Sequence, residues 1–140
     1  MLESASGGEQ ERTTAAMAGD ERSVILVEDD AAMRKAIERL LRAAGFRSVQ
    51  SFASAEALLG TQAANVATCL VFDIHLPGIS GIELRRRLSD AGCRAPVVFI
   101  TAHDDPALRQ EAELLGCIGY FRKPFEGYQL LEVVRQALKT

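Results

Sequence analysis

The chain has 140 residues, of which 48% are hydrophobic and 25% charged, a composition typical of one soluble globular domain. No apolar run approaches the about 18 residues needed to span a bilayer, and the N-terminus lacks the pattern of a secretory signal. The net charge of −3 gives no electrostatic reason to expect nucleic-acid binding by this domain. Three cysteines without CxxC spacing (Cys69, Cys93 and Cys117) indicate reduced thiols packed among apolar residues, and therefore a cytoplasmic protein.

Residues 1–22 contain few apolar side chains, which predicts a flexible N-terminal tail before a domain over residues 23–140. Beyond this tail, short apolar runs alternate with segments of helical periodicity. The expected strands are 24–28, 46–51, 67–72, 96–101 and 117–121. All except 46–51 lack polar alternation, which predicts strands covered on both faces, as in a parallel sheet. The run 46–51 alternates, which is typical of an edge strand.

A helix is expected after each strand, because each intervening segment is amphipathic or carries capping residues. The expected helices are 31–44, 54–60, 80–92, 104–116 and 126–139, with caps at Ser54, Ser80 and Asp104 or Asp105. The run Arg85–Arg87 on the third helix is expected on a solvated face, with docking of an acidic partner as the alternative. Five strand-helix units with right-handed crossovers predict an α/β fold with a doubly wound sheet.

Polar side chains follow four of the expected strands at their carboxyl ends, where open parallel sheets bind ligands. They are Glu28, Asp29 and Asp30 after the first strand, Asp73 in the third, Thr101 in the fourth and Lys123 after the fifth. Carboxylates at one edge repel one another unless a cation lies among them, and their oxygen atoms suit Mg²⁺. Asp29, Asp73 and the backbone carbonyl of His75 are the expected metal ligands.

An aspartate beside Mg²⁺, a lysine and a threonine is the set of groups that can form an acyl phosphate on a carboxylate. In this hypothesis Asp73 attacks the phosphorus atom, while the metal and the Lys123 ammonium neutralise the charge that develops on the transferred group. Thr101 offers a hydroxyl to another phosphoryl oxygen.

Four motifs in order resemble the receiver domain of two-component response regulators. They are "VILVEDD", "VFDIHLPGISG", "FITAH" and "GYFRKPF", and the resemblance extends over residues 23 to 139. The sequence around Asp73 and Thr101 is similar to that of receivers that are often joined to a LuxR-type helix-turn-helix. The resemblance implies the flavodoxin-like (βα)5 fold, with five parallel strands in the order 2-1-3-4-5 and helices on both faces.

The resemblance also implies residue roles. Asp73 would accept phosphate from a histidine kinase or phosphotransfer protein. Asp29 would ligate Mg²⁺ (or Mn²⁺) directly, Glu28 would act through water, and Lys123, in a cis bond with Pro124, would pair with the phosphoryl group. Asp30 is expected to begin the first helix. Thr101 and Tyr120 would form the conformational switch, for which the alternative is a tyrosine that only packs at the core boundary. His75 and His103, two positions after Asp73 and Thr101, would line the path of the attacking water and tune the rate of dephosphorylation. Two histidines at this spacing match no recognisable zinc site.

Such a domain would catalyse its own phosphorylation and slow dephosphorylation only, and would control an output domain or a downstream protein. Phosphorylation would favour a homodimer through the fourth helix, the fifth strand and the fifth helix. Two alternatives remain at this point. A haloacid dehalogenase phosphohydrolase would need a second aspartate at the position of His75, and its acid pair would come late in the chain. A phosphate-independent scaffold of the same fold would not need the complete set of site residues.

Overall fold

The computed structural model describes residues 23–139, so the tail expected over 1–22 lies outside the described residues. Five parallel strands form one sheet in the order β2-β1-β3-β4-β5, which confirms the expected fold. The strands are β1 (Ser23–Val27), β2 (Ser48–Phe52), β3 (Cys69–Asp73), β4 (Val97–Thr101) and β5 (Gly119–Arg122). Within the described residues, every helix is too short or too polar to cross a membrane.

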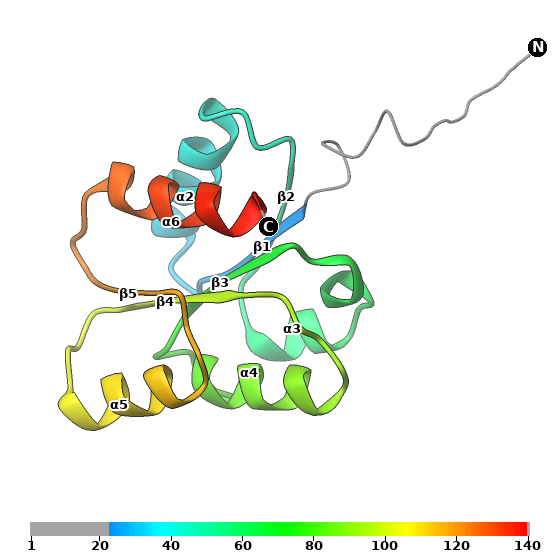
Figure 1. Ribbon diagram of the computed structural model, residues 1–140, viewed down its shortest axis with the longest axis vertical. Helices are drawn as coiled ribbons and strands as arrows, with labels where there is room; N and C mark the ends of the chain where they lie inside the picture. Colours follow the sequence, from blue (N-terminus) through cyan, green and yellow to red (C-terminus); the bar gives the residue numbers. More distant parts are fainter. Residues whose placement is uncertain (1–22, 140) are drawn as a thin grey trace, which may run out of the picture.

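Helices cover both faces of the sheet, as Figure 1 shows, with α2 and α6 on one face and α3, α4 and α5 on the other. Their bounds are α2 (Ala31–Ala43), α3 (Ala55–Leu59), α4 (Gly81–Asp90), α5 (Pro106–Leu114) and α6 (Gly127–Leu138). All five were expected within a few residues of these bounds. A short 3-10 helix, η3 (Ala63–Val66), was not expected, since four residues are too few for a periodic signal.

Side-chain caps fix where four of the helices begin. The carboxyl of Asp30 accepts the Met33 N–H at 3.0 Å, and the Asp105 carboxyl accepts the Ala107 N–H at 2.8 Å. Ser54 and Ser80 cap α3 and α4 in the same way. Asp30 therefore begins α2, as the sequence predicted, and Glu28 and Asp29 lie between the end of β1 and this cap.

The central strands are buried along their whole length, whereas both outer strands are partly exposed. Every residue of β1, β3 and β4 is buried. The expectation that the fifth strand is covered on both faces was wrong, because β5 pairs only with β4 and its residues are half-buried or exposed. The exposure of β5 therefore follows from its position at the edge of the sheet, and the order of the strands determines that position.

The arginine run on α4 does not lie on one solvated face. Arg85 is buried, with 8% of its surface exposed, and its guanidinium donates to the Cys93 carbonyl at 3.3 Å. Arg86 and Arg87 are exposed and pair with Glu83. The expectation was wrong for Arg85 because residues 82, 85 and 88 follow helical spacing and share the face that packs on the sheet.

Candidate functional site

Three carboxylates converge at the carboxyl ends of β1 and β3. Glu28 and Asp29 follow β1, and Asp73 ends β3, where the register places Val27 beside Phe72. Each of the three residues offers an oxygen atom, and these atoms lie within 4.8 Å of one another. Glu28 and Asp73 are buried, whereas Asp29 is exposed to solvent. The sequence therefore identified the cluster correctly, and the structure adds that it opens to solvent at Asp29.

Lys123 brings a positive charge into this cluster. Its Nζ lies 2.8 Å from Glu28 Oε1 and 3.1 Å from Asp73 Oδ2. The backbone N–H of Lys123 donates to the Thr101 carbonyl at 2.7 Å, and the bond to Pro124 is cis, as expected. The side chain reaches the two carboxylates, and only 15% of it is exposed.

Burial and charge set the ionisation of these groups. Burial raises the pKa of the Glu28 carboxyl above its usual value, although hydrogen bonds from Lys123 and the Asp30 N–H act in the opposite direction. Burial alone would lower the pKa of Lys123, but its bonds with Glu28 and Asp73 outweigh this effect and the pKa is raised. Lys123 is therefore an ammonium ion at neutral pH. It offsets one charge of the three-carboxylate cluster and leaves an excess of negative charge.

The negative excess and the donor set fit a hard divalent cation. Mg²⁺ binds oxygen atoms at about 2.0–2.1 Å, so ligands on opposite sides of one ion are about 4.2 Å apart. The 4.8 Å limit on the carboxylate oxygens is slightly larger than this distance. The oxygen atoms of the three carboxylates are therefore close enough for one such ion to lie among them.

The loop after Asp73 is fixed in part by Gly81 and Glu56, two residues that the sequence analysis did not identify. The N–H of His75 donates to Asp73 Oδ1 at 3.0 Å. Gly81 begins α4 so close to β3 that a Cβ atom there would overlap the Asp73 carbonyl oxygen. Glu56 on α3 accepts the Ile79 N–H at 3.0 Å, and it occupies the space beside Gly78, whose φ is +77°. The glycines in "LPGISG" were the only sequence signal for these contacts, since Glu56 is distant along the chain.

Thr101 and Tyr120, the expected switch pair, are not joined to Asp73 in this structure. The Thr101 hydroxyl donates to the His103 carbonyl at 2.9 Å and accepts the His103 N–H at 3.1 Å. Tyr120 is half-buried, and the Arg109 guanidinium lies 4.8 Å from the centre of its ring. The pKa of the Tyr120 phenol is raised, mainly because the side chain is partly buried. Both side chains thus contact residues of the segment 103–109, between β4 and the first turns of α5.

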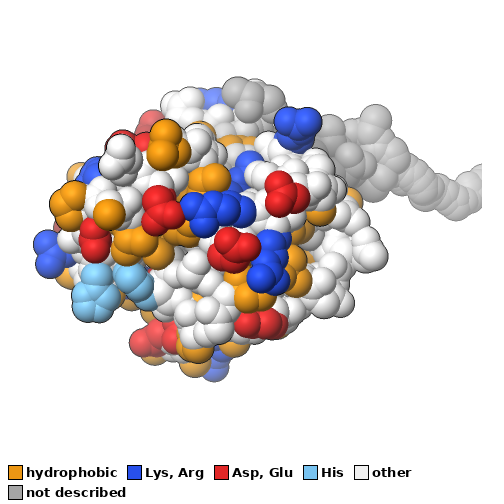
Figure 2. Space-filling view, turned by 90° about the horizontal axis from the view of Figure 1, so that it is seen from below, with side chains coloured by type: hydrophobic (Ala, Val, Ile, Leu, Met, Phe, Trp, Pro, Cys, Tyr) orange, Lys and Arg blue, Asp and Glu red, His pale blue; other side chains and the backbone are white. Residues whose placement is uncertain are grey.

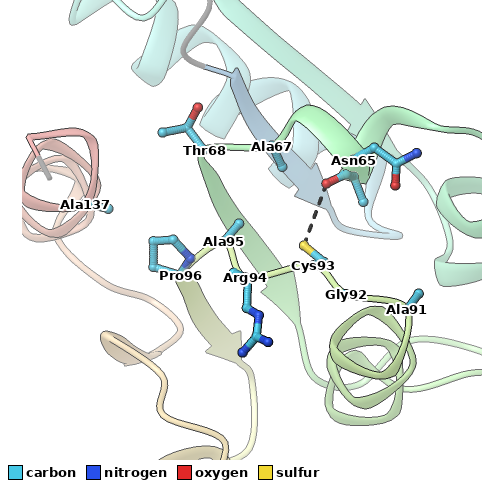
Figure 3. Close-up of a pocket in the computed structure, with 11 residues that line it drawn as sticks. Asn65, Ala67, Thr68, Ala91, Gly92, Cys93, Arg94, Ala95, Pro96 and Ala137 are labelled. Carbon is cyan, nitrogen blue, oxygen red and sulfur yellow. Dashed lines mark hydrogen bonds between the residues drawn. The ribbon is translucent and has the colours of Figure 1, made fainter.

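A separate hollow of about 630 Å³ lies beside the amino-terminal ends of β3 and β4, away from the carboxylate cluster at their carboxyl ends (Figure 3). Its walls are mostly small residues, and none of the described residues that line it carries a carboxylate. Cys93 in this wall donates its thiol to the Ala64 carbonyl at 3.6 Å, and all three cysteines are free thiols packed against the two apolar cores. Burial raises the pKa of the Cys69 thiol to about 12. The packing of these thiols among apolar residues agrees with the sequence prediction.

Comparison with known proteins agrees with this fold and site. The sequence model of the response regulator receiver domain matches residues 24–135, so the chain belongs to this family. It is a receiver domain of two-component signalling and not a metabolic enzyme. The haloacid dehalogenase alternative is thereby excluded.

Two curated bacterial relatives illustrate the similarity. Response regulator protein TmoT of Ectopseudomonas mendocina is 38% identical over 121 residues, which are 86% of this chain and 54% of TmoT. Transcriptional regulatory protein FixJ of Bradyrhizobium diazoefficiens is 35% identical over 116 residues, 83% of this chain and 56% of FixJ. The chain thus spans about half the length of these curated relatives.

Solved structures give the same assignment. The response regulator StyR matches with a TM-score of 0.76 and 39% identity over 84% of this chain and 59% of StyR. FixJ-N matches with a TM-score of 0.75 and 33% identity over 84% of this chain and 94% of FixJ-N.

Proposed function

We propose that Asp73 accepts a phosphoryl group from the phosphohistidine of a histidine kinase or a phosphotransfer protein. One Asp73 oxygen bonds to phosphorus as the phosphorus–nitrogen bond breaks, and the imidazole leaves with that electron pair. The observation that carries this proposal is the position of Lys123 Nζ, 3.1 Å from Asp73 Oδ2, beside the other two carboxylates. An ammonium at this distance can contact an oxygen of a phosphoryl group on Asp73.

The acid cluster would hold Mg²⁺ (or Mn²⁺) during this transfer. Asp29 and Asp73 are the proposed direct ligands, together with the His75 carbonyl, and Glu28 acts through water. When bound, the ion would supply neutralising charge to the phosphoryl oxygens. Because all of these proposed ligands are oxygen atoms, they favour a hard cation over zinc.

Phosphorylation would then change the switch residues. We infer that the Thr101 hydroxyl leaves the His103 backbone, bonds a phosphoryl oxygen, and frees space that Tyr120 fills. With Tyr128→Phe as background, Tyr120 is the only tyrosine, and a fluorescence signal that ignores phosphorylation would contradict this step. Water would later hydrolyse the acyl phosphate slowly, at a rate that the His75 and His103 side chains tune. Equal lifetimes in His75→Ala, His103→Ala and the parent protein would contradict the tuning role.

The output of the switch is a partner protein or an output domain, because the curated relatives are about twice as long as the matched region. FixJ is described as a transcriptional regulatory protein, and a LuxR-type output domain is the form that we propose here. We also propose a cytoplasmic location, which suits three free thiols.

A small phosphodonor tests the central step. We expect acetyl phosphate with Mg²⁺ to label the protein on Asp73, and chelation of the metal to abolish labelling. Asp73→Asn should remove the label, whereas Asp90→Asn, an exposed aspartate on α4, should retain it. Labelling that survives Asp73→Asn would overturn the assignment. Absence of any label would favour the phosphate-independent scaffold.

A further inference from the structure

The two histidines of the chain lie next to each other on the surface. His75 belongs to the loop between β3 and α4, and His103 to the loop between β4 and α5. Their ring centres are 5.2 Å apart, and the ring planes are nearly perpendicular at 86°. Both residues are exposed, and Figure 2 shows the two histidine side chains together, with acidic side chains on the same face. The spacing along the sequence gave no sign of this pair, which forms only because β3 and β4 are neighbours in the sheet.

We propose that His75 and His103 together bind a divalent transition-metal ion such as Zn²⁺. A zinc ion lies about 2.0–2.1 Å from an imidazole nitrogen and about 1.1 Å further from the ring centre, so two imidazoles on one tetrahedral ion have centres about 5.2 Å apart. The observed separation of 5.2 Å is the same. Rotation of the two exposed side chains is then enough to direct one nitrogen of each ring to a common point.

In the unphosphorylated protein, hydrogen bonds hold the backbones that carry the pair. The His75 N–H is bonded to Asp73 Oδ1, and the His103 N–H and carbonyl are both bonded to the Thr101 hydroxyl. These contacts use backbone groups and leave the imidazole nitrogens available. A ligand pair held in this way loses less conformational freedom on binding than two side chains on mobile segments.

The charges around the pair suit a cation. Asp104 and Asp105 directly follow His103, and Asp29 lines the same hollow as His75. The arginines on neighbouring surfaces are themselves paired with acids: Arg86 with Glu83 and Glu111, and Arg109 with Asp104 and Glu113. The donor type separates the two metal sites, since nitrogen ligands favour zinc and the oxygen cluster favours magnesium. Two protein ligands leave the other positions of a tetrahedral ion to water, which predicts exchangeable binding.

An ion at this position would link the loop that follows Asp73 to the loop that follows Thr101. It would restrict the approach of water to the carboxyl of Asp73. We therefore expect Zn²⁺ to lengthen the lifetime of a phosphoryl group on Asp73, a consequence that rests on the proposed function. The binding of zinc itself does not rest on it, because the unphosphorylated protein already presents the pair.

Calorimetric titration of the unphosphorylated protein with Zn²⁺, in excess Mg²⁺ to occupy the acid cluster, tests the site. We expect one zinc per chain, and at least about tenfold weaker binding in both His75→Gln and His103→Gln. The loss of affinity in the double variant should be smaller than the sum of the losses in the two single variants, because either substitution already breaks the two-ligand site. Gln110→Ala, an exposed position on α5, is the matched control and should bind like the parent. Circular dichroism of each variant verifies folding.

Zinc binding that neither histidine variant weakens, or that only one of them weakens, would overturn the site. No zinc binding at all would leave the pair as an edge-to-face contact between rings, and would also overturn it. Decay of the labelled protein with and without Zn²⁺ then tests the consequence. Histidine-dependent binding with an unchanged decay rate would overturn the effect on lifetime and keep the site, whereas failure of labelling at Asp73 concerns the proposed function alone.

Discussion

Gly81 has no room for a side chain, because a Cβ atom would overlap the carbonyl oxygen of Asp73. The neighbouring atoms are backbone and cannot rotate away. We expect Gly81→Ala to lower the free energy of unfolding by about 1–3 kcal/mol, the usual range for forcing extra volume into a packed region. It should also slow phosphorylation of Asp73, since the strand end has to shift. Urea denaturation measures the first effect.

Gly60 provides the matched control for this substitution. A Cβ atom there would be 3.6 Å from its nearest neighbours, which is ordinary contact, and the backbone φ is −76°. Gly60→Ala should therefore change stability by no more than about 0.5 kcal/mol, or raise it slightly by restricting the unfolded chain. Equal losses in the two variants would contradict the role assigned to Gly81.

At the level of elements, α3 holds the loop between β3 and α4 through the bond from the Ile79 N–H to Glu56 Oε2. This hydrogen bond is the main reason that the pKa of Glu56 is lowered from 4.5. A carboxyl with a lowered folded-state pKa stabilises the fold above its unfolded pKa, and this stability is lost as the pH falls through the folded value. We expect Glu56→Gln to be less stable than the parent at pH 7, and the difference to shrink as the pH falls below 4.5.

Denaturant unfolding at several pH values measures this difference. Glu132→Gln, an exposed position on α6 away from the loop, is the control and should follow the parent over the whole range. A stability difference for Glu56→Gln that stays constant from pH 7 to pH 3 would show that the lost interaction does not depend on the carboxylate charge.

For the whole molecule, parallel strand order explains which features the sequence predicted. Asp73 and Thr101 end their strands, and Asp29 and Lys123 come just after theirs. Because the carboxyl ends of parallel strands lie on the same side of a sheet, the sequence could predict this grouping without knowledge of side-chain packing. The features missed depend on contacts between elements. The burial of Arg85 depends on which face of α4 meets the sheet, and the pairing of the two histidine rings depends on the shape of two loops.

The face formed by α5, β5 and α6 carries large apolar residues that are exposed to solvent. Leu114 on α5 is 80% exposed, Ile118 before β5 is 41% exposed, and Tyr128 on α6 is 68% exposed. Tyr120 and Thr101 contact the segment that leads into α5. We propose that phosphorylation repositions this face and favours pairing of two chains through it. We expect Mg²⁺ with beryllofluoride, a phosphoryl analogue, to double the mass measured by light scattering.

Charged substitutions locate the pairing surface. Leu114→Glu should prevent the increase in mass, because two carboxylates would have to be buried at the interface. The side chain of Val66, on η3, is also exposed, at 65%, but lies outside α5, β5 and α6, so Val66→Glu should leave the increase intact. A doubled mass that persists in Leu114→Glu and disappears in Val66→Glu would place the interface elsewhere. A mass that never changes with beryllofluoride, in protein whose Asp73 is labelled by a phosphodonor, would mean that the phosphorylated face serves a different partner.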